Sequence, residues 1–102
     1  MGSFSLTNAA KADLRNIAKF TERQWGREQR KNYLKGIDDA FCLLADSPSL
    51  GISCDYIAPE LRKHPFQSHV IYYDIASATR VLIVRVLHKR MDVSQIPFNT
   101  YR

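Results

Sequence analysis

The densest group of side chains that could do chemistry lies near the C-terminus, in the run Arg85-Val86-Leu87-His88-Lys89-Arg90-Met91-Asp92. Arginine, histidine and lysine side chains gathered where a strand leaves a sheet can bind phosphate, assist acid–base chemistry or contact an acidic protein surface. A structural role is an equal alternative, in which the run is a charged strand exit and Asp92 caps a last short turn. We take residues 85–92 as the candidate site, with these alternatives open.

The motifs of common enzyme classes are absent from the sequence, which has no phosphate-binding glycine loop, no GxSxG elbow and no HExxH pair. Its two cysteines lack CxxC spacing and nearby paired histidines, so we expect neither a metal site nor a cofactor. We expect Cys42 to be a buried helical thiol and Cys54 a loop thiol. These absences argue against most small-molecule enzymes, and we assign no catalytic residues.

The elements that must position the candidate site begin with a strand and a helix. Polarity alternates over residues 4–6, which predicts a short strand with one buried face. Thr7 or Asn8 can cap a helix whose apolar positions follow three- and four-residue spacing as far as Trp25. Gly26 ends this helix, because glycine adopts the left-handed conformation at little cost.

A second helix is predicted over about residues 27–46, where Ser47 and Pro48 stop it. The short link at Gly26 makes the two helices an antiparallel hairpin. Gly36 inside the second helix suggests a close approach between the helices, since glycine is otherwise unfavourable there. Aromatic residues at helical spacing usually pack, so we assign three of them to the core: Trp25, Tyr33 and Phe41.

The second half of the chain reads as strands. A loop is predicted over residues 47–59, followed by a short edge strand over 61–64. Residues 68–75 and 80–88 are rich in Val, Ile and Tyr, and 76–79 would join them as a hairpin. Runs of helices and then strands predict an α+β fold, with the helical hairpin on one face of a mostly antiparallel, four-stranded sheet.

The last predicted strand is unusual, because both of its side-chain parities are apolar over residues 81–87. One face of a two-layer sheet normally meets water. The strand could be a central one with a few tolerated surface valines. Alternatively, it presents an apolar patch, enlarged by Val70 and Tyr72, that binds another protein.

The composition is that of one ordinary globular domain over residues 1–102. Fifteen Lys and Arg against ten Asp and Glu give a net charge of +5, spread along the chain. This balance favours attraction to nucleic acid or to acidic protein surfaces, and it also suits a merely solvated basic surface. The sequence has no membrane-spanning run and no signal-peptide pattern, so we expect a cytoplasmic protein with no membrane partner.

Several segments together carry a family resemblance. They are, in chain order, residues 10–17 (AKADLRNI), Trp25-Gly26 with Gln29 and Tyr33, residues 41–45 with Pro48 and Gly51, Leu61-Arg62, residues 68–73 (SHVIYY), and Arg85 through His88 to Met91-Asp92. In this order and spacing the chain resembles the ParE branch of the RelE/ParE toxins of type II toxin–antitoxin systems. The resemblance covers nearly the whole chain, and it implies a β-α-α-β-β-β fold.

The resemblance also implies two partners. A ParD-like antitoxin, whose disordered C-terminal segment folds on the toxin, would cover apolar surface, and its ribbon-helix-helix domain would bind promoter DNA. The freed toxin would poison DNA gyrase by stabilising the cleaved-DNA state. We expect gyrase to contact Arg85, His88, Lys89, Arg90, Met91 and Asp92. We expect the antitoxin to contact Leu14, Val70, Tyr72, Leu82, Val84 and Val86.

Two other functions remain open. Related RelE-like toxins cleave messenger RNA on the ribosome, and part of such a set could be formed here by Arg62, Lys63, Arg85, His88 and Lys89. The C-terminal segment adds Tyr101 but no acidic residue after Asp92, so a complete nuclease set is not evident. The chain could also be an inert homologue that only binds its antitoxin. Individually, Arg85 could be a buried ion-pair residue and His88 a strand-end histidine with ordinary partners.

Overall fold

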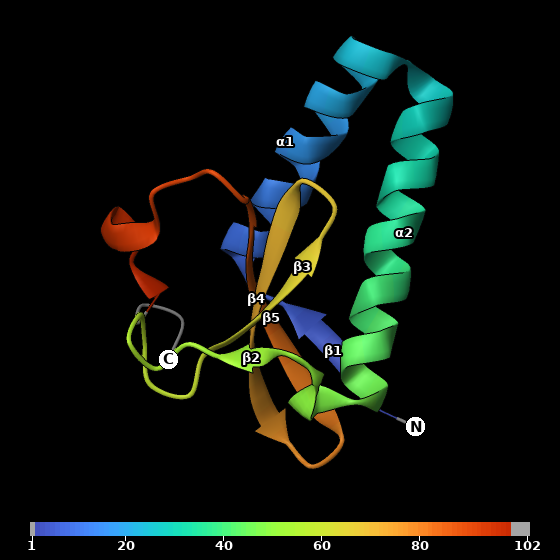
Figure 1. Cartoon of the computed structure of the whole chain (residues 1–102). Coiled ribbons are helices and arrows are strands. Elements are labelled where there is room, and N and C mark those ends of the chain that lie inside the picture. The colour runs from blue at the N-terminus through green and yellow to red at the C-terminus, as the bar shows by residue number, and fades with distance from the viewer. Residues whose placement is uncertain (1, 99–102) are drawn as a thin grey trace.

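The fold consists of a helical hairpin on one face of a mixed sheet (Figure 1). A computed structural model describes residues 2–98; position 101, considered above for a nuclease, lies outside them. The elements are β1 (Ser3–Leu6), α1 (Asn8–Trp25), α2 (Arg27–Asp46), the 3-10 turn η1 (Pro48–Leu50), β2 (Ile52–Ser53), β3 (Arg62–Phe66), β4 (His69–Ser77), β5 (Arg80–His88) and the 3-10 turn η2 (Val93–Gln95).

The sheet order is β1-β5-β4-β3-β2, with β1 parallel to β5 and the other pairs antiparallel. The predicted α+β class and mostly antiparallel sheet are confirmed. The sheet has five strands rather than four, because Ile52 and Ser53 of the predicted loop pair with β3.

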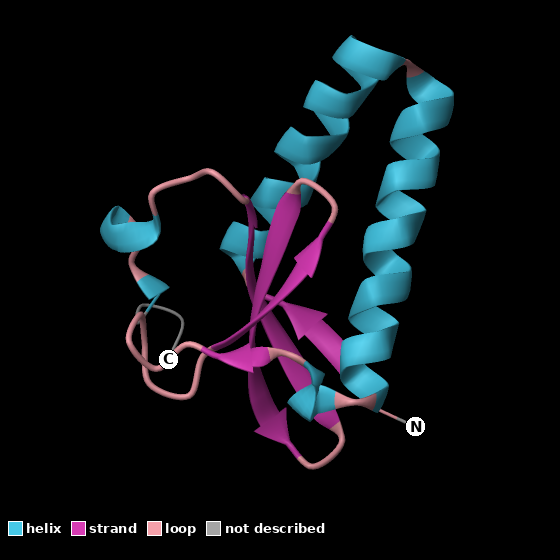
Figure 2. Cartoon of the chain, viewed as in Figure 1, coloured by secondary structure: helices cyan, strands magenta, loops and turns pink. Residues whose placement is uncertain are grey.

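The two helices begin and end where the sequence predicted, and Figure 2 shows them as one hairpin beside the sheet. Thr7 is the cap of α1, since its hydroxyl accepts a hydrogen bond from the Ala10 N–H at 3.0 Å. Gly26 joins the helices with φ of 94°, a conformation that favours glycine. Figure 1 shows this junction at the end of the hairpin farthest from β2.

A bulge in β5 changes which face of the sheet each residue of this apolar strand points to. The pairing with β4 shifts by one residue, from Tyr72 opposite Arg85 to Tyr73 opposite Ile83, so Val84 is the extra residue. As a result Ile83 and Val86, three positions apart, face the same core. The strand therefore supplies apolar residues to both faces of the sheet.

The helix-side core fills the space between the hairpin and the sheet. Its buried residues are Ala10, Ile17, Ile37, Ala40, Phe41, Leu44, Ala45, Ile71, Tyr73, Val81, Ile83 and Val86. The assignment of Phe41 to the core is confirmed, and Tyr33 packs against its margin. The assignment of Trp25 is wrong: this last residue of α1 has a side chain that is 72% exposed.

A second core covers the opposite face of the sheet. It joins Cys54, Ala58, Leu61, Tyr72, Val84, Leu87 and Phe98, with Ile57, Val70, Leu82, Val93 and Ile96 at its margin. The cover comes from the segment between β2 and β3 and from residues 93–98. The second apolar face of β5 is therefore covered largely by the chain itself, an arrangement that neither interpretation of the sequence included.

Two smaller expectations, for Cys42 and Gly36, are corrected by packing, whereas Cys54 lies in a loop as expected. Cys42 is exposed on α2 and Cys54 is the buried thiol, and burial raises the pKa of Cys54. Gly36 makes room for the Phe66 ring rather than for α1, since an added Cβ would lie 2.7 Å from that ring. Among residues 2–98, no helix combines the length and apolar character needed to cross a membrane.

Candidate functional site

Arg85 is held by an ion pair with Asp13 of α1. Its Nε lies 2.8 Å from Oδ2 and its Nη2 lies 2.9 Å from Oδ1. The side chains are 21% and 10% exposed, so the pair is largely shielded from water. Both donors are directed at the carboxylate, and these hydrogen bonds raise the pKa of Arg85 above its ordinary value. Of the two roles open for Arg85, the structure favours the ion-pair role.

The same carboxylate also provides a hydrogen-bond partner at an unpaired edge of the sheet. β1 pairs with β5 only as far as Ile83, so the rest of β5 has no neighbouring strand on that side. There the Val86 N–H donates to Asp13 Oδ2 at 3.0 Å, and the Thr7 hydroxyl donates to the Val84 carbonyl at 2.7 Å. Side chains at the start of α1 thus replace a missing strand.

The strand exit, defined as residues 88–92, is exposed at every position. The Lys89 N–H donates to the Ser68 carbonyl at 2.9 Å and the Met91 N–H to the His88 carbonyl at 3.0 Å, which fixes a tight turn. The Arg90 N–H donates to His88 Nδ1 at 3.1 Å. Lys89 and Arg90 form no ion pair within residues 2–98, so both charges are free for a partner.

Asp92 has the structural role considered for it. Its Oδ1 accepts a hydrogen bond from the Ser94 N–H at 2.9 Å and caps η2. This backbone hydrogen bond lowers the pKa of the Asp92 carboxyl. The capped turn leads the chain from the strand exit toward the second core.

A groove of about 660 Å³ lies beside the strand exit. This helix-hairpin groove is lined by Asp13, Asn16, Ile17, Phe20, Thr21, Trp25, Gln29, Tyr33, Gln67, Ser68, His69, Arg85, Val86, Leu87, His88 and Met91. Three of its apolar side chains are well exposed, Phe20 at 59%, Trp25 at 72% and Met91 at 47%. An apolar groove with exposed walls is a typical protein-binding surface.

Aromatic and imidazole rings meet in this groove. The Tyr33 hydroxyl and His69 Nδ1 are 2.7 Å apart, and the His69 and His88 rings are 5.6 Å apart. Burial, followed by the nearby His88, lowers the pKa of His69 below its usual 6.5, although Asp13 acts in the opposite direction. Burial raises the pKa of Tyr33. Which of the two groups donates depends on the tautomer of His69.

The six residues expected to bind an antitoxin do not share one face. Leu14 and Val86 belong to the helix side, whereas Val70, Tyr72, Leu82 and Val84 belong to the second core. Two of them, Leu82 and Val84, line a second-face groove of about 510 Å³ with Leu6, Thr7, Asn8, Ala9, Arg85, Pro97 and Phe98. Arg85 therefore lies between the two grooves.

The set considered for a ribonuclease is largely engaged in structural contacts. Arg62 donates to the carbonyls of Gly51 and Ser49, at 3.1 and 3.3 Å. Lys63 Nζ donates to the Tyr56 hydroxyl at 2.9 Å, and this hydrogen bond raises the pKa of Lys63. With Arg85 bound to Asp13, only His88 and Lys89 of that set are exposed.

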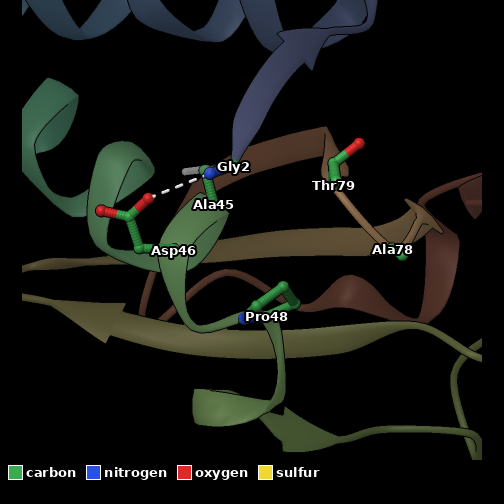
Figure 3. Close-up of a pocket in the computed structure, with 6 residues that line it drawn as sticks. All are labelled: Gly2, Ala45, Asp46, Pro48, Ala78 and Thr79. Atoms are coloured by element: carbon green, nitrogen blue, oxygen red, sulfur yellow. Dashed lines mark hydrogen bonds between the residues drawn. The ribbon is translucent and has the colours of Figure 1, made fainter.

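Another pocket, shown in Figure 3, is lined by Gly2, Ala45, Asp46, Pro48, Ala78 and Thr79. The Gly2 N–H donates to Asp46 Oδ1 at 3.2 Å. This pocket shares no residue with the strand exit or with either groove. Within the described part of the chain, no group of three or more His, Cys, Asp or Glu could hold a metal ion.

Sequence reasoning overlooked several groove residues. Asp13 lies on the buried face of α1, near Ala10 and Ile17, and a carboxylate at such a position needs a partner. That signal could have linked Asp13 with Arg85. Phe20 interrupts the charged side of the helix, which could have marked it as exposed. No local pattern indicated that His69 and His88 would meet.

Comparisons with known proteins agree with this architecture. The family model described as "ParE toxin of type II toxin-antitoxin system, parDE" matches residues 4–93. Toxin ParE1 of Mycobacterium tuberculosis (strain CDC 1551 / Oshkosh) is 37% identical over 92 residues, which cover 90% of this chain and 94% of that toxin. Toxin ParE1 of Caulobacter vibrioides is 33% identical, with the same coverage of both chains.

Two further relatives extend the comparison. Toxin ParE of Escherichia coli is 30% identical over 93 residues, covering 91% of this chain and 90% of that toxin. A solved structure titled "Chromosomal ParDE TA system from P. aeruginosa" superposes with a TM-score of 0.72 at 19% identity. It covers 86% of this chain and 96% of its own, and it supports the fold alone. The chain belongs to the ParE toxin family of type II toxin–antitoxin systems.

Proposed function

We propose that this ParE-family toxin poisons DNA gyrase by stabilising the cleaved-DNA state, and that it does so in the cytoplasm. The observation that carries the proposal is the strand exit, where Lys89 and Arg90 are exposed and unpaired within the described chain. Exposed cations beside an apolar groove suit an enzyme surface that carries DNA.

Poisoning of this kind requires binding rather than catalysis. A protein that binds one state of an enzyme cycle more tightly than the others shifts the population toward that state. Family membership and the missing catalytic motifs both support this mode. Met91 and the helix-hairpin groove would supply apolar contact, while Lys89 and Arg90 would supply charge. His88 would orient the turn through its hydrogen bond with the Arg90 N–H.

We further propose that a ParD-like antitoxin neutralises the toxin through the second-face groove. Leu82 and Val84 line this groove, and Val70 and Tyr72 lie in the same core. An antitoxin segment that folds on binding could pack in this groove and take the place of Pro97 and Phe98, which line it. Leu14 and Val86 would act from the helix side. The antitoxin would bind promoter DNA through a ribbon-helix-helix domain, so the complex would repress its own operon.

One pair of assays tests the gyrase proposal against its alternatives. Purified toxin is added to gyrase with supercoiled DNA, and separately to a translation mixture with labelled message. Cleaved DNA with intact message supports gyrase poisoning. Cleaved message with unaffected gyrase would overturn it in favour of a ribonuclease. Inactivity in both assays, with folded protein, would also overturn it and indicate an inert homologue.

A further inference from the structure

The exposed side of α1 carries a regular row of positive charge. Lys11, Arg15, Lys19 and Arg23 follow one another at four-residue spacing, and all four are exposed. Four residues of helix rise about 6 Å and turn by about 40° beyond a full turn, so the four cations form one gently winding strip. We call these four residues the α1 strip. It faces away from the buried residues Ala10 and Ile17.

The charge of the α1 strip is not neutralised by ion pairs among residues 2–98. Helix α1 contains two carboxylates, Asp13 and Glu22. Asp13 is bound to Arg85 on the buried side, and Glu22 lies within 3.7 Å of Arg27 and 3.6 Å of Arg30. No ion pair in residues 2–98 includes a member of the strip. Four adjacent cations without counterions repel one another, so this surface favours a polyanionic partner.

The structure argues against two classes of polyanion. An amphipathic helix that binds a membrane must bury its apolar face in the lipid, but the apolar face of α1 is buried against the sheet. Single-stranded nucleic acid is usually held by aromatic rings between cations. The strip contains no aromatic residue, and Phe20 and Trp25 line the helix-hairpin groove instead.

We propose that the α1 strip is a binding site for the phosphate backbone of duplex DNA. A duplex carries about one charge per 1.7 Å of its axis, so each cation of a row spaced by about 6 Å has a phosphate within reach, and such contacts do not read the sequence. This site is inferred from the residues of α1 alone. Its use in holding the DNA of a gyrase complex rests on the proposed function.

Fluorescence anisotropy of a labelled duplex with the full-length toxin, without gyrase, tests the site directly. Four phosphate contacts predict a slope of log K against log salt of about −3.6, or roughly a 150-fold loss between 50 and 200 mM salt. The variant with Lys11, Arg15, Lys19 and Arg23 all replaced by Gln should lose nearly all of this slope. Each single substitution should reduce its magnitude by about 0.9.

The matched control is Lys35→Gln, which removes one exposed cation of α2 that is paired with Asp39 at 3.0 Å. It should leave the slope unchanged. The site is overturned if the wild type does not bind duplex at 50 mM salt, or if the control and the strip variants lose equal slope. Tighter binding to the single strand or to anionic phosphatidylglycerol vesicles would also overturn it. A toxin that does not bind duplex DNA alone could still poison gyrase, so the two proposals fail separately. If the quadruple variant does not fold, the four single variants still test the site.

Discussion

Asp13 holds Arg85 and the backbone of Val86 with one carboxylate, and so joins the start of α1 to the unpaired edge of β5. The contact links residues 72 and 73 positions apart. It also directs the Arg85 charge into the protein. The cations available to a target at this end of the sheet are therefore Lys89 and Arg90, and substitution of Arg85 tests folding before it tests recognition.

Replacing Asp13 by alanine should destabilise the fold by about 3 kcal/mol, because the largely buried Arg85 and the Val86 N–H both lose their partner. The free energy of unfolding in urea measures this cost. The matched control is Asp39→Ala, which breaks the exposed pair with Lys35 and should cost less than about 0.5 kcal/mol. Equal effects of the two substitutions would contradict the role assigned to Asp13.

His69 should make stability depend on pH. Its pKa is lowered in the fold, chiefly by burial, so below pH 6.5 the unfolded chain binds the proton more readily. Its contribution is therefore complete above pH 6.5 and is lost as pH falls toward the lower folded pKa. Tyr33, His88 and Asp13 are the titratable groups around it.

The measurement is the free energy of unfolding of wild type and His69→Gln between pH 8 and pH 5. The wild type should lose stability more steeply than the variant below pH 6.5. Parallel curves would show that His69 titrates in the fold as it does in the unfolded chain.

Tyr73→Phe should cost about 1–3 kcal/mol, since it removes a buried hydroxyl with two partners. That hydroxyl accepts from the Gly51 N–H at 2.8 Å and donates to the Pro48 carbonyl at 2.6 Å. Thermal unfolding followed by circular dichroism measures the loss. Tyr56→Phe is the control, because Tyr56 is 75% exposed, and it should have little effect. No loss in Tyr73→Phe would mean that the turn at η1 does not need the hydroxyl.

Trp25 should report on a solvated site. It is the single tryptophan of the chain, so its fluorescence should be quenched freely by acrylamide in the folded protein. Trp25→Ala should change the free energy of unfolding by less than about 0.5 kcal/mol. Phe41→Ala, in the helix-side core, should cost about 3–5 kcal/mol. A shielded Trp25, or a large cost of removing it, would contradict the exposed position.

Periodicity predicted the order of the elements well, because each long element carries its own pattern. The apolar spacing of α1 and α2 and the Val- and Ile-rich β4 and β5 are local properties of the sequence. The two residues of β2 could not be predicted, since Ile52 and Ser53 become a strand only by pairing with β3. The bulge at Val84 likewise depends on the partner strand.

The candidate site was predicted less completely, because burial depends on distant segments. Residues 88–92 are exposed together, as a strand exit should be. Nothing local indicated that Ala58, Leu61 and Phe98 would cover the second face of β5. Trp25 looked like a core residue from spacing alone, but helical spacing does not show whether other elements cover the last residue of a helix.

The amount of gyrase-cleaved DNA formed with wild type and with Lys89→Gln/Arg90→Gln toxin is the most direct test of the central claim. Both side chains are exposed and without ion pairs among the described residues, so the double variant should fold normally. We predict that wild type and the Lys35→Gln control accumulate cleaved DNA and that the double variant accumulates at least about tenfold less, a difference of about 1.4 kcal/mol. Equal cleavage with all three proteins would contradict the strand exit as the gyrase-binding site, and no cleavage with wild type would contradict gyrase poisoning itself.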